Sequence, residues 1–254
     1  RTSIVYSRRT GQRNDEQQVI LDSHLPRFSL RRCMQIKRLI FASYIGQAGI
    51  FILLLSVSIA VAFYVGKQNE TYSFLNHFIS ELGEKGVSPL AYIFNGGLIL
   101  GGACISFFML GLAMHIGNSW GLILGAIGLV TGLSATLVGV FPMNQLEIHT
   151  AIANTFFYGG LLAALGYTLY VVFSSEPRLP KITALTGGLT MLAFAAFVWF
   201  LPAPLEDGQS IHEILKNRPE VWTLPILEWV VFLCVMIWIG STASLMRMTI
   251  KNDK

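Results

Sequence analysis

Long stretches of this chain contain no charged residue, and this feature constrains its fold more than any other. No Asp, Glu, Lys or Arg occurs between Lys85 and Glu147, or from Ile148 through Ser175. Charged residues make up only 13% of the 254-residue chain, about half of the roughly 25% typical of soluble globular proteins. A water-soluble fold would expose large apolar patches along these stretches. The sequence therefore predicts an integral membrane protein.

Six apolar segments are each long enough to cross a bilayer core, which needs about 20 residues of helix. They are Leu39–Val65, Leu90–Met114, Trp120–Phe141, Thr150–Phe173, Ile182–Leu201 and Ile226–Met246. The runs are continuous and lack two-residue alternation, which favours helices over barrel strands. The predicted fold is an all-α integral membrane bundle of six transmembrane helices over residues 39–246. A basic arm (1–38) precedes the bundle, and a short tail (247–254) follows it.

The distribution of Lys and Arg predicts the orientation of the bundle. Fourteen of the 18 lie in the arm, in the loop around Arg178 and Lys181, and in the tail. The other four are Lys67, Lys85, Lys216 and Arg218. Because cytoplasmic loops carry the excess of Lys and Arg, both termini are expected on the cytoplasmic-type side. The net charge of +4 comes from the arm, so it indicates a membrane flank or a lipid- or partner-binding arm, and no nucleic-acid partner.

Glycines recur at spacings of three and four in two adjacent predicted spans. They are Gly97 and Gly101 in the second span, and Gly121, Gly125, Gly128 and Gly132 in the third. Small residues at this spacing share one helix face and let neighbouring backbones approach closely in a membrane. A phosphate-binding loop would need a strand-to-helix turn, which the sequence does not predict here. These glycines are therefore expected to pack helices together.

The polar residues of the bundle gather at its outer end. They are Asn76, His77, Ser80, Glu81, Glu147, His149 and Glu228. Apolar residues recur at helical spacing through Thr71–Glu84, which predicts a short interfacial helix with the first four of these residues on its other side. Ser210 and Glu213 form a capping-box pattern before a second such helix at Ile211–Asn217. Ionisable residues within a span usually face the bundle interior and mark function, and Glu228 is such a residue.

Three chemical readings of this outer cluster stay open. His77 and Glu81 share a helix face, and with His149 and Glu228 they could bind zinc. Ser80 with a histidine and a carboxylate could act as a nucleophile, although no nucleophile-elbow pattern surrounds it. The third reading is a hydrogen-bonded polar cap that holds helix ends together. We expect Glu81, His149 and Glu228 to meet, because an unpaired buried carboxylate is costly.

Several motifs give the chain a family resemblance over roughly residues 40–246. They are Phe78–Gly83, Ser88-Pro89, Phe94–Gly97, Gly139–Pro142 followed by His149, and Glu228-Trp229. The chain resembles a family of uncharacterised six-span prokaryotic membrane proteins (domain of unknown function 998). The layout is also similar to the wider group that contains the DRAM autophagy modulators and proteins that remodel the lipids of GPI anchors. The resemblance implies a six-helix bundle and, through the GPI-related members, lipid handling.

Three functions are compatible with these observations. The first is a protein that binds or handles a lipid headgroup at the outer membrane face, with membrane lipids as its partners. The second is a non-catalytic accessory subunit of a larger membrane assembly, with other membrane subunits as partners. The third is a metal-dependent membrane hydrolase. The sequence names no cofactor, no catalytic residue and no particular membrane.

Overall fold

The chain has the architecture of an integral multi-pass membrane protein. The computed structural model describes residues 8–201 and 218–252, with side chains from Arg31 to Lys251. Every regular element in these ranges is helical. Five helical stretches are long and apolar enough to cross a membrane: Arg31–Ala62, Ala91–Ile116, Ser119–Val140, Met143–Phe173 and Thr223–Lys251. A sixth apolar helix, Thr183–Trp199, is shorter.

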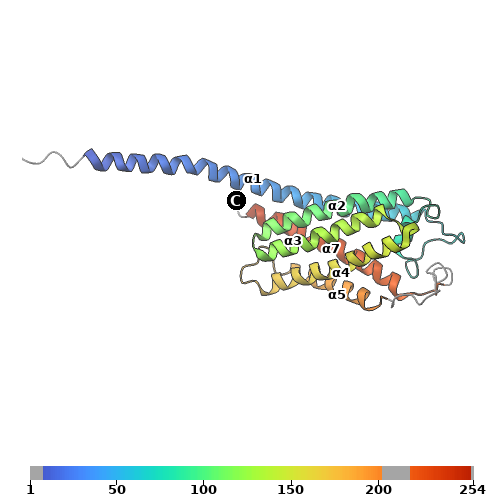
Figure 1. The fold of residues 1–254 in the computed structure, drawn as a ribbon. Helices are drawn as coiled ribbons and strands as arrows, with labels where there is room; N and C mark the ends of the chain where they lie inside the picture. The colour runs from blue at the N-terminus through green and yellow to red at the C-terminus, as the bar shows by residue number, and fades with distance from the viewer. Residues whose placement is uncertain (1–7, 202–217, 253–254) are drawn as a thin grey trace, which may run out of the picture.

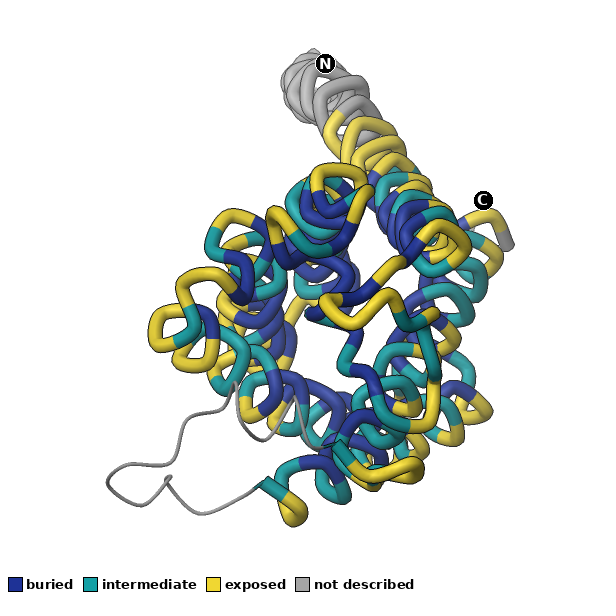
Figure 2. The backbone as a smooth tube through the Cα atoms, turned by 90° about the vertical axis from the view of Figure 1, so that its right-hand side faces the viewer, coloured by how far each residue is buried: buried dark blue, intermediate teal, exposed yellow. Residues whose placement is uncertain are grey.

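Six helices form a closed ring. Their bounds are α1 (Arg8–Ala62), α2 (Ala91–Ile116), α3 (Ser119–Val140), α4 (Leu146–Phe173), α5 (Thr183–Trp199) and α7 (Thr223–Asn252). Each packs against the next in this order, and α7 returns to pack against α1. Figure 2 shows the ring end-on, and Figure 1 shows the helices lying side by side along a common direction. Two short 3-10 helices, η1 (Ile79–Gly83) and η2 (Met143–Gln145), lie in the connections.

The ends of α1 differ from the predicted first span. The span was predicted to begin at Leu39, but the helix begins at Arg8, so no break separates the arm from the bundle. Figure 1 shows α1 continuing well beyond the bundle. At its other end α1 stops at Ala62, three residues before the predicted end. There the chain enters a turn in which Gly66 and Glu70 pair through their backbones and Asn69 adopts a positive φ of 61°.

The other helices end near the predicted residues, for local reasons. α2 ends at Ile116, and Gly117 caps it with a left-handed φ of 72° that is costly for residues with a side chain. The side chain of Asn118 then accepts a hydrogen bond from Gly121 N–H and caps α3. α4 begins at Leu146, one turn earlier than predicted, which places Glu147 and His149 inside its first turn.

The six glycines of the predicted packing face are buried between helices. Gly97 and Gly101 of α2 lie against Ser56 and Leu53 of α1. In α3, an added Cβ would meet α2 at every one of the four glycines: Gly121 and Gly125 at Ala113, Gly128 at Met109, and Gly132 at Ser106. Close approach of α3 to α2 therefore depends on the absence of a side chain at these four glycines.

The interfacial helix predicted over Thr71–Glu84 is only partly helical, because the structure confines it to Ile79–Gly83. Residues before Ile79 pair instead with the segment that leads into α7: Trp222 N–H donates to Leu75 O, and Asn76 Nδ2 donates to Pro219 O. These tertiary hydrogen bonds replace those that a longer helix would make within itself. The second predicted interfacial helix, Ile211–Asn217 with Ser210 and Glu213, lies outside the described residues.

Connections at the two ends of the ring fix its layout. At one end, His115 Nε2 lies 3.0 Å from Arg178 O, which joins the end of α2 to the loop between α4 and α5. At the other end, η1 lies across the ring beside the starts of α2 and α7. Figure 1 places the C-terminus at the same end of the bundle as the protruding part of α1. The η1 end is therefore opposite the protruding part of α1 and the end of α7.

Candidate functional site

The η1 helix closes one end of the ring and is held there by polar contacts. The Glu81 carboxylate accepts a hydrogen bond from Phe78 N–H (2.8 Å) at the start of η1. At its end, Asn95 Nδ2 of α2 donates to Gly83 O (2.9 Å). Just beyond, the side chain of Asn144 pairs with both backbone groups of Lys85, at 2.8 and 2.9 Å. These contacts tie η1 to α2 and to the junction between α3 and α4.

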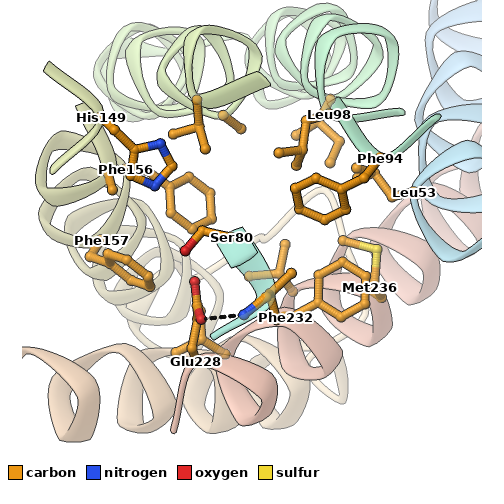
Figure 3. Close-up of a pocket in the computed structure, with 17 residues that line it drawn as sticks. Leu53, Ser80, Phe94, Leu98, His149, Phe156, Phe157, Glu228, Phe232 and Met236 are labelled. Atoms are coloured by element: carbon orange, nitrogen blue, oxygen red, sulfur yellow. Dashed lines mark hydrogen bonds between the residues drawn. The ribbon is translucent and has the colours of Figure 1, made fainter. Parts of the chain in front are cut away.

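A cavity of about 100 Å³ lies inside the ring beneath η1. Its wall is formed by Ile79 of η1 and by thirteen apolar side chains from α1, α2, α3, α4 and α7. These are Leu53, Phe94, Leu98, Ile105, Ala135, Val138, Ala153, Phe156, Phe157, Val231, Phe232, Val235 and Met236. Three polar side chains also line it, namely Ser80, His149 and Glu228. Figure 3 shows these three gathered beside the aromatic rings of Phe156 and Phe157. The cavity is thus apolar over most of its surface and polar at one place.

Glu228, in the second turn of α7, points toward η1. Its Oε2 accepts a hydrogen bond from Ile79 N–H at 2.7 Å, which fastens η1 to α7. Figure 3 shows the other carboxyl oxygen directed into the cavity, toward Ser80. Within the described part of the chain, this oxygen has no hydrogen-bond partner. One carboxyl oxygen of Glu228 therefore binds η1, which covers the cavity, and the other faces the interior of the cavity.

His149, in the first turn of α4, is buried at the cavity wall, with 6% of its surface exposed. Its Nδ1 lies 2.8 Å from the carbonyl oxygen of Phe141. Because a carbonyl can only accept, Nδ1 carries the proton and donates it, and Nε2 of the neutral ring is an acceptor. Nε2 has no hydrogen-bond partner among the described residues. Ser80 Oγ lies 3.3 Å from Met143 Sδ, a weak acceptor.

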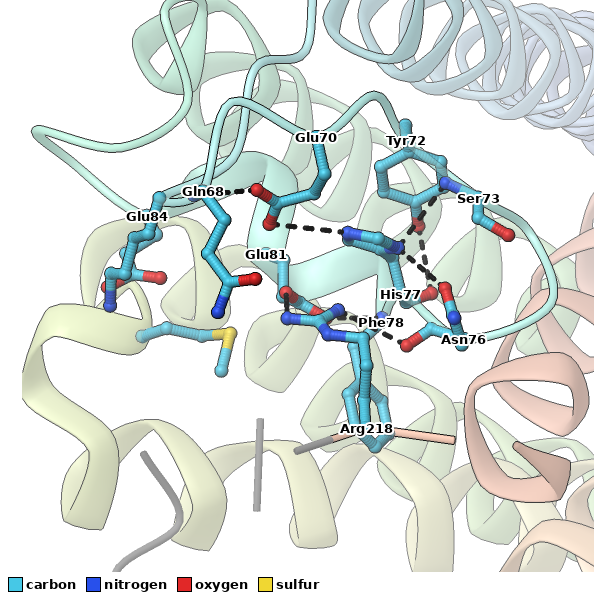
Figure 4. Close-up of polar contacts among 12 residues, drawn as sticks. Gln68, Glu70, Tyr72, Ser73, Asn76, His77, Phe78, Glu81, Glu84 and Arg218 are labelled. Atoms are coloured by element: carbon cyan, nitrogen blue, oxygen red, sulfur yellow. Dashed lines mark hydrogen bonds and ion pairs between the residues drawn. The ribbon is translucent and has the colours of Figure 1, made fainter. Parts of the chain in front are cut away.

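A second hollow, of about 600 Å³, lies on the other side of η1. We call it the polar basin; it is lined by Tyr64, Lys67, Gln68, Glu70, Thr71, Ser73, Asn76, His77, Glu81, Glu84, Val87 and Arg218. Arg218 binds Glu81 through two parallel hydrogen bonds, of 3.0 and 2.9 Å (Figure 4). Lys67 pairs with Glu84 at 2.6 Å. The charges that line the basin are therefore largely paired with one another.

His77 is a deeply buried titratable group of the basin, with 3% of its surface exposed, as much as Glu81. Asn76 Nδ2 donates to Pro219 O, which turns the Asn76 oxygen toward His77 Nδ1 at 2.9 Å. Nε2 lies 3.8 Å from a carboxylate oxygen of Glu70. Burial lowers the pKa of His77, against the opposing effect of the nearby Glu81 and Glu70 carboxylates. Burial likewise raises the pKa of the neighbouring Tyr72.

The structure divides the predicted outer cluster into separate places. Ser80, His149 and Glu228 line the cavity, whereas Asn76, His77 and Glu81 line the basin. Glu147 is exposed in the first turn of α4 and lines neither. We expected Glu81, His149 and Glu228 to share one pocket. His149 and Glu228 do line the same cavity, whereas Glu81 lines the basin.

Neither the zinc site nor the serine nucleophile that the sequence left open is formed by the described residues. Among the described residues, no group of three or more His, Cys, Asp or Glu is arranged to hold a metal ion. Ser80 contacts Met143, and the His149 nitrogen that would orient toward a carboxylate is bound to the carbonyl of Phe141. A serine nucleophile needs a base within hydrogen-bond reach. No such contact joins Ser80 and His149 in the described structure.

Two groups of site residues were not predicted from the sequence. Arg218 was counted only as an outer-side charge, although its guanidinium pairs with the buried carboxylate of Glu81. The sequence signal that could have indicated this pairing is the position of Arg218, eight residues before the predicted last span. The phenylalanines of the cavity wall were included in spans without any role. Because phenylalanines occur in all six predicted spans, no sequence signal separates the rings that face the cavity from those that face lipid.

Comparison with known families supports the DUF998 part of the resemblance seen in the sequence, and does not show the link to the DRAM and GPI-related group. Residues 48–245 match the model of a family described as a protein of unknown function (DUF998). No match was found among curated proteins or among solved structures. The matched range contains the cavity residues and most of the ring from the middle of α1 to the last turns of α7. The chain, a multi-pass membrane protein by its own helices, belongs to the DUF998 family.

Proposed function

We propose that this protein binds a lipid at the outer membrane face, with part of the lipid chain in the cavity beneath η1. The observation that carries the proposal is the cavity itself, which combines a wall of apolar side chains with Ser80, His149 and Glu228 at one place. Ligand sites in proteins have this composition, with a few convergent polar groups in a largely apolar hollow. An amphiphile matches both parts of such a surface.

The polar end of the cavity, and not its wall, would select the ligand. A lipid chain in the bilayer is already in an apolar solvent, so moving it into the cavity gains little hydrophobic free energy. Close packing against Phe94, Phe156 and Phe157 can contribute dispersion contacts. The hydrogen bonds formed at His149 and Glu228 therefore decide which lipid binds.

The proposal includes a membrane topology of six crossings with both termini on the cytoplasmic-type side. α5 has 17 residues, which corresponds to the lower limit of about 17–25 residues for a transmembrane helix. It starts beside the loop tied to His115 and it packs between α4 and α7 along the ring. A sixth crossing returns α7 to the end that carries the excess of Lys and Arg. The basin and η1 then lie at the outer face.

The resemblance to proteins that remodel the lipids of GPI anchors supports the same class of ligand.

The test is to fill the cavity and measure bound lipid. Ala153 of α4 lines the cavity, whereas Ala151 is exposed on the same helix. Ala153→Phe should occupy the space of the ligand, and Ala151→Phe adds the same side chain facing outward. Native mass spectrometry of the purified proteins should find lipid retained by wild type and Ala151→Phe, and lost from Ala153→Phe. Equal lipid retention by all three proteins would contradict a ligand in this cavity.

A second candidate is an accessory subunit, and the observation that favours it is the long protruding part of α1 (Figure 1). An isolated helix in water gains little stability without packing, so a partner protein would stabilise this extension. Gentle detergent extraction followed by sizing should then find the protein in a complex. A monomer under all extraction conditions would contradict this candidate.

A further inference from the structure

The polar basin on the outer side of η1 has one more carboxylate than it has cations. Its lining includes Glu70, Glu81 and Glu84 against Lys67 and Arg218. Arg218 pairs with Glu81, and Lys67 pairs with Glu84. In the part of the chain that the structure describes, no Lys or Arg forms an ion pair with Glu70. The charge of Glu70 is therefore left to be balanced from outside the chain.

Glu70 presents one carboxylate oxygen to the basin. Its Oε2 accepts a hydrogen bond from Gln68 N–H at 2.7 Å, and 32% of its side chain is exposed. Burial raises the pKa of this carboxyl, but backbone hydrogen bonds and the nearby His77 and Arg218 lower it by more, so the group stays ionised at neutral pH. Its Oε1 lies 3.8 Å from Nε2 of His77, and Figure 4 shows the two groups facing each other.

The His77 nitrogen that faces Glu70 is buried and has no hydrogen-bond partner among the described residues. The other nitrogen, Nδ1, lies 2.9 Å from the side-chain oxygen of Asn76, which can only accept, so Nδ1 carries the proton. Ser73 N–H also points at Nδ1, at 3.3 Å, but the opposite tautomer would place two acceptors 2.9 Å apart with no proton between them. Burial lowers the pKa of His77, so the ring is neutral near pH 7 and Nε2 is an acceptor.

The ring of His77 is held in this orientation before any ligand arrives. Tyr64 and Tyr72 pack against it, with ring centroids 5.5 and 5.2 Å away. A buried polar atom without a hydrogen bond costs about 1–3 kcal/mol, and a ligand that donates to Nε2 removes this cost. The volume of the basin, about 600 Å³, is within the roughly 300–1,000 Å³ of ligand pockets.

Two acceptors that face each other, one of them charged, are complementary to a cation with several hydrogen-bond donors. A primary ammonium has three N–H donors and one positive charge. A quaternary ammonium has the charge without the donors, and a hydroxyl has a donor without the charge. A metal ion is a poorer match, because no group of three or more His, Cys, Asp or Glu is arranged to hold one among the described residues.

We propose that the basin binds a primary ammonium group between Glu70 Oε1 and His77 Nε2. Free amines of the outer solution and the ethanolamine headgroups of lipids share this chemistry. The inference goes beyond the lipid proposed for the cavity and does not depend on it, because the basin lies on the other side of η1 and has a different lining.

Three small probes separate charge from hydrogen bonding: ethanolamine, choline and ethylene glycol. They are titrated by calorimetry into the purified protein, in a neutral detergent and a buffer free of primary amines. Ethanolamine should bind with a Kd on the order of 1 mM, as expected for so small a ligand. Choline and ethylene glycol should bind roughly 10- to 100-fold more weakly, the range for hydrogen bonds to charged groups.

The variant Glu70→Gln removes the charge and keeps the shape. Its amide oxygen can still accept from Gln68 N–H, so the turn before η1 is retained. Glu147→Gln is the matched control, because Glu147 is exposed and lines neither the basin nor the cavity. Ethanolamine binding should weaken at least about 10-fold in Glu70→Gln and stay at the wild-type level in Glu147→Gln. If Glu70→Gln does not fold, the three probes on wild type decide the question.

Native mass spectrometry with phosphatidylethanolamine and phosphatidylcholine of the same acyl chains identifies the source of the amine. A lipid ligand predicts a preference for phosphatidylethanolamine that Glu70→Gln removes. A soluble amine predicts equal retention of the two lipids, together with ethanolamine binding in solution. Absence of ethanolamine binding, equally tight binding of choline, or wild-type affinity in Glu70→Gln would each overturn the assignment.

Discussion

Gly132→Ala should destabilise the protein, although alanine is ordinarily the better helix former. A Cβ at Gly132 would lie 2.9 Å from the backbone nitrogen of Ser106 and 3.0 Å from its Cα. Both are backbone positions in α2, so the clash is relieved only by moving one helix. Overpacking of this kind costs about 1–3 kcal/mol, and replacing glycine by alanine in a helix returns up to ~1 kcal/mol. We expect a net loss of about 1–2 kcal/mol.

Gly96→Ala, on α2, is the matched control, because no atom lies within 4 Å of the position its Cβ would take. Only the helix-propensity gain remains there, so its stability should equal or exceed that of wild type. Thermal unfolding in one detergent, followed by size-exclusion chromatography, measures both variants. One kcal/mol corresponds to a shift of about 2–4 °C for a chain of this size. Equal midpoints for Gly132→Ala and Gly96→Ala would refute the contact between α2 and α3 at Ser106.

Three other predictions concern the outer end. Arg218→Leu should cost about 3–5 kcal/mol because it leaves Glu81 buried and unpaired, and adding Glu81→Leu should recover part of that loss in the same thermal assay. Burial lowers the pKa of His77 in the folded state, so the unfolded state binds more protons near its ordinary pKa of about 6.5; stability should therefore fall between pH 7 and 5, and less steeply in His77→Gln. In a background without native cysteines, a cysteine at Gln68 should react with an impermeant reagent outside intact cells, and one at Ser175 should not; the reverse pattern would overturn the topology.

The apolar spans could be predicted from sequence because length and composition determine them almost directly. The ends of α2, α3 and α4 lie within a few residues of the prediction, where Gly117, Asn118 and Pro142 provide local stop and start signals. The start of α1 at Arg8 could not be predicted, because the boundary at Leu39 marks where charge ends and not where a helix begins. A polar helix can continue past that point, and hydropathy carries no information about it. The shortness of α5 depends on where the chain turns after Trp199, which hydropathy also does not reveal.

The division of the outer cluster follows from the type of helix that forms there. A regular α-helix over Thr71–Glu84 would put His77 and Glu81 on one face, four residues apart. The structure instead has a five-residue 3-10 helix, in which successive side chains are about 120° apart. Ser80 therefore faces the cavity while its neighbour Glu81 faces the basin. The choice between the two helices is made by tertiary contacts, since Leu75 and Asn76 bond to the segment before α7 and Glu81 binds Arg218. A sequence pattern shows which residues are polar here, but the partners that separate them lie more than 130 positions away in the chain. The same contacts make η1 a wall with two different sides, and this is why one short segment can border both an apolar cavity and a charged basin.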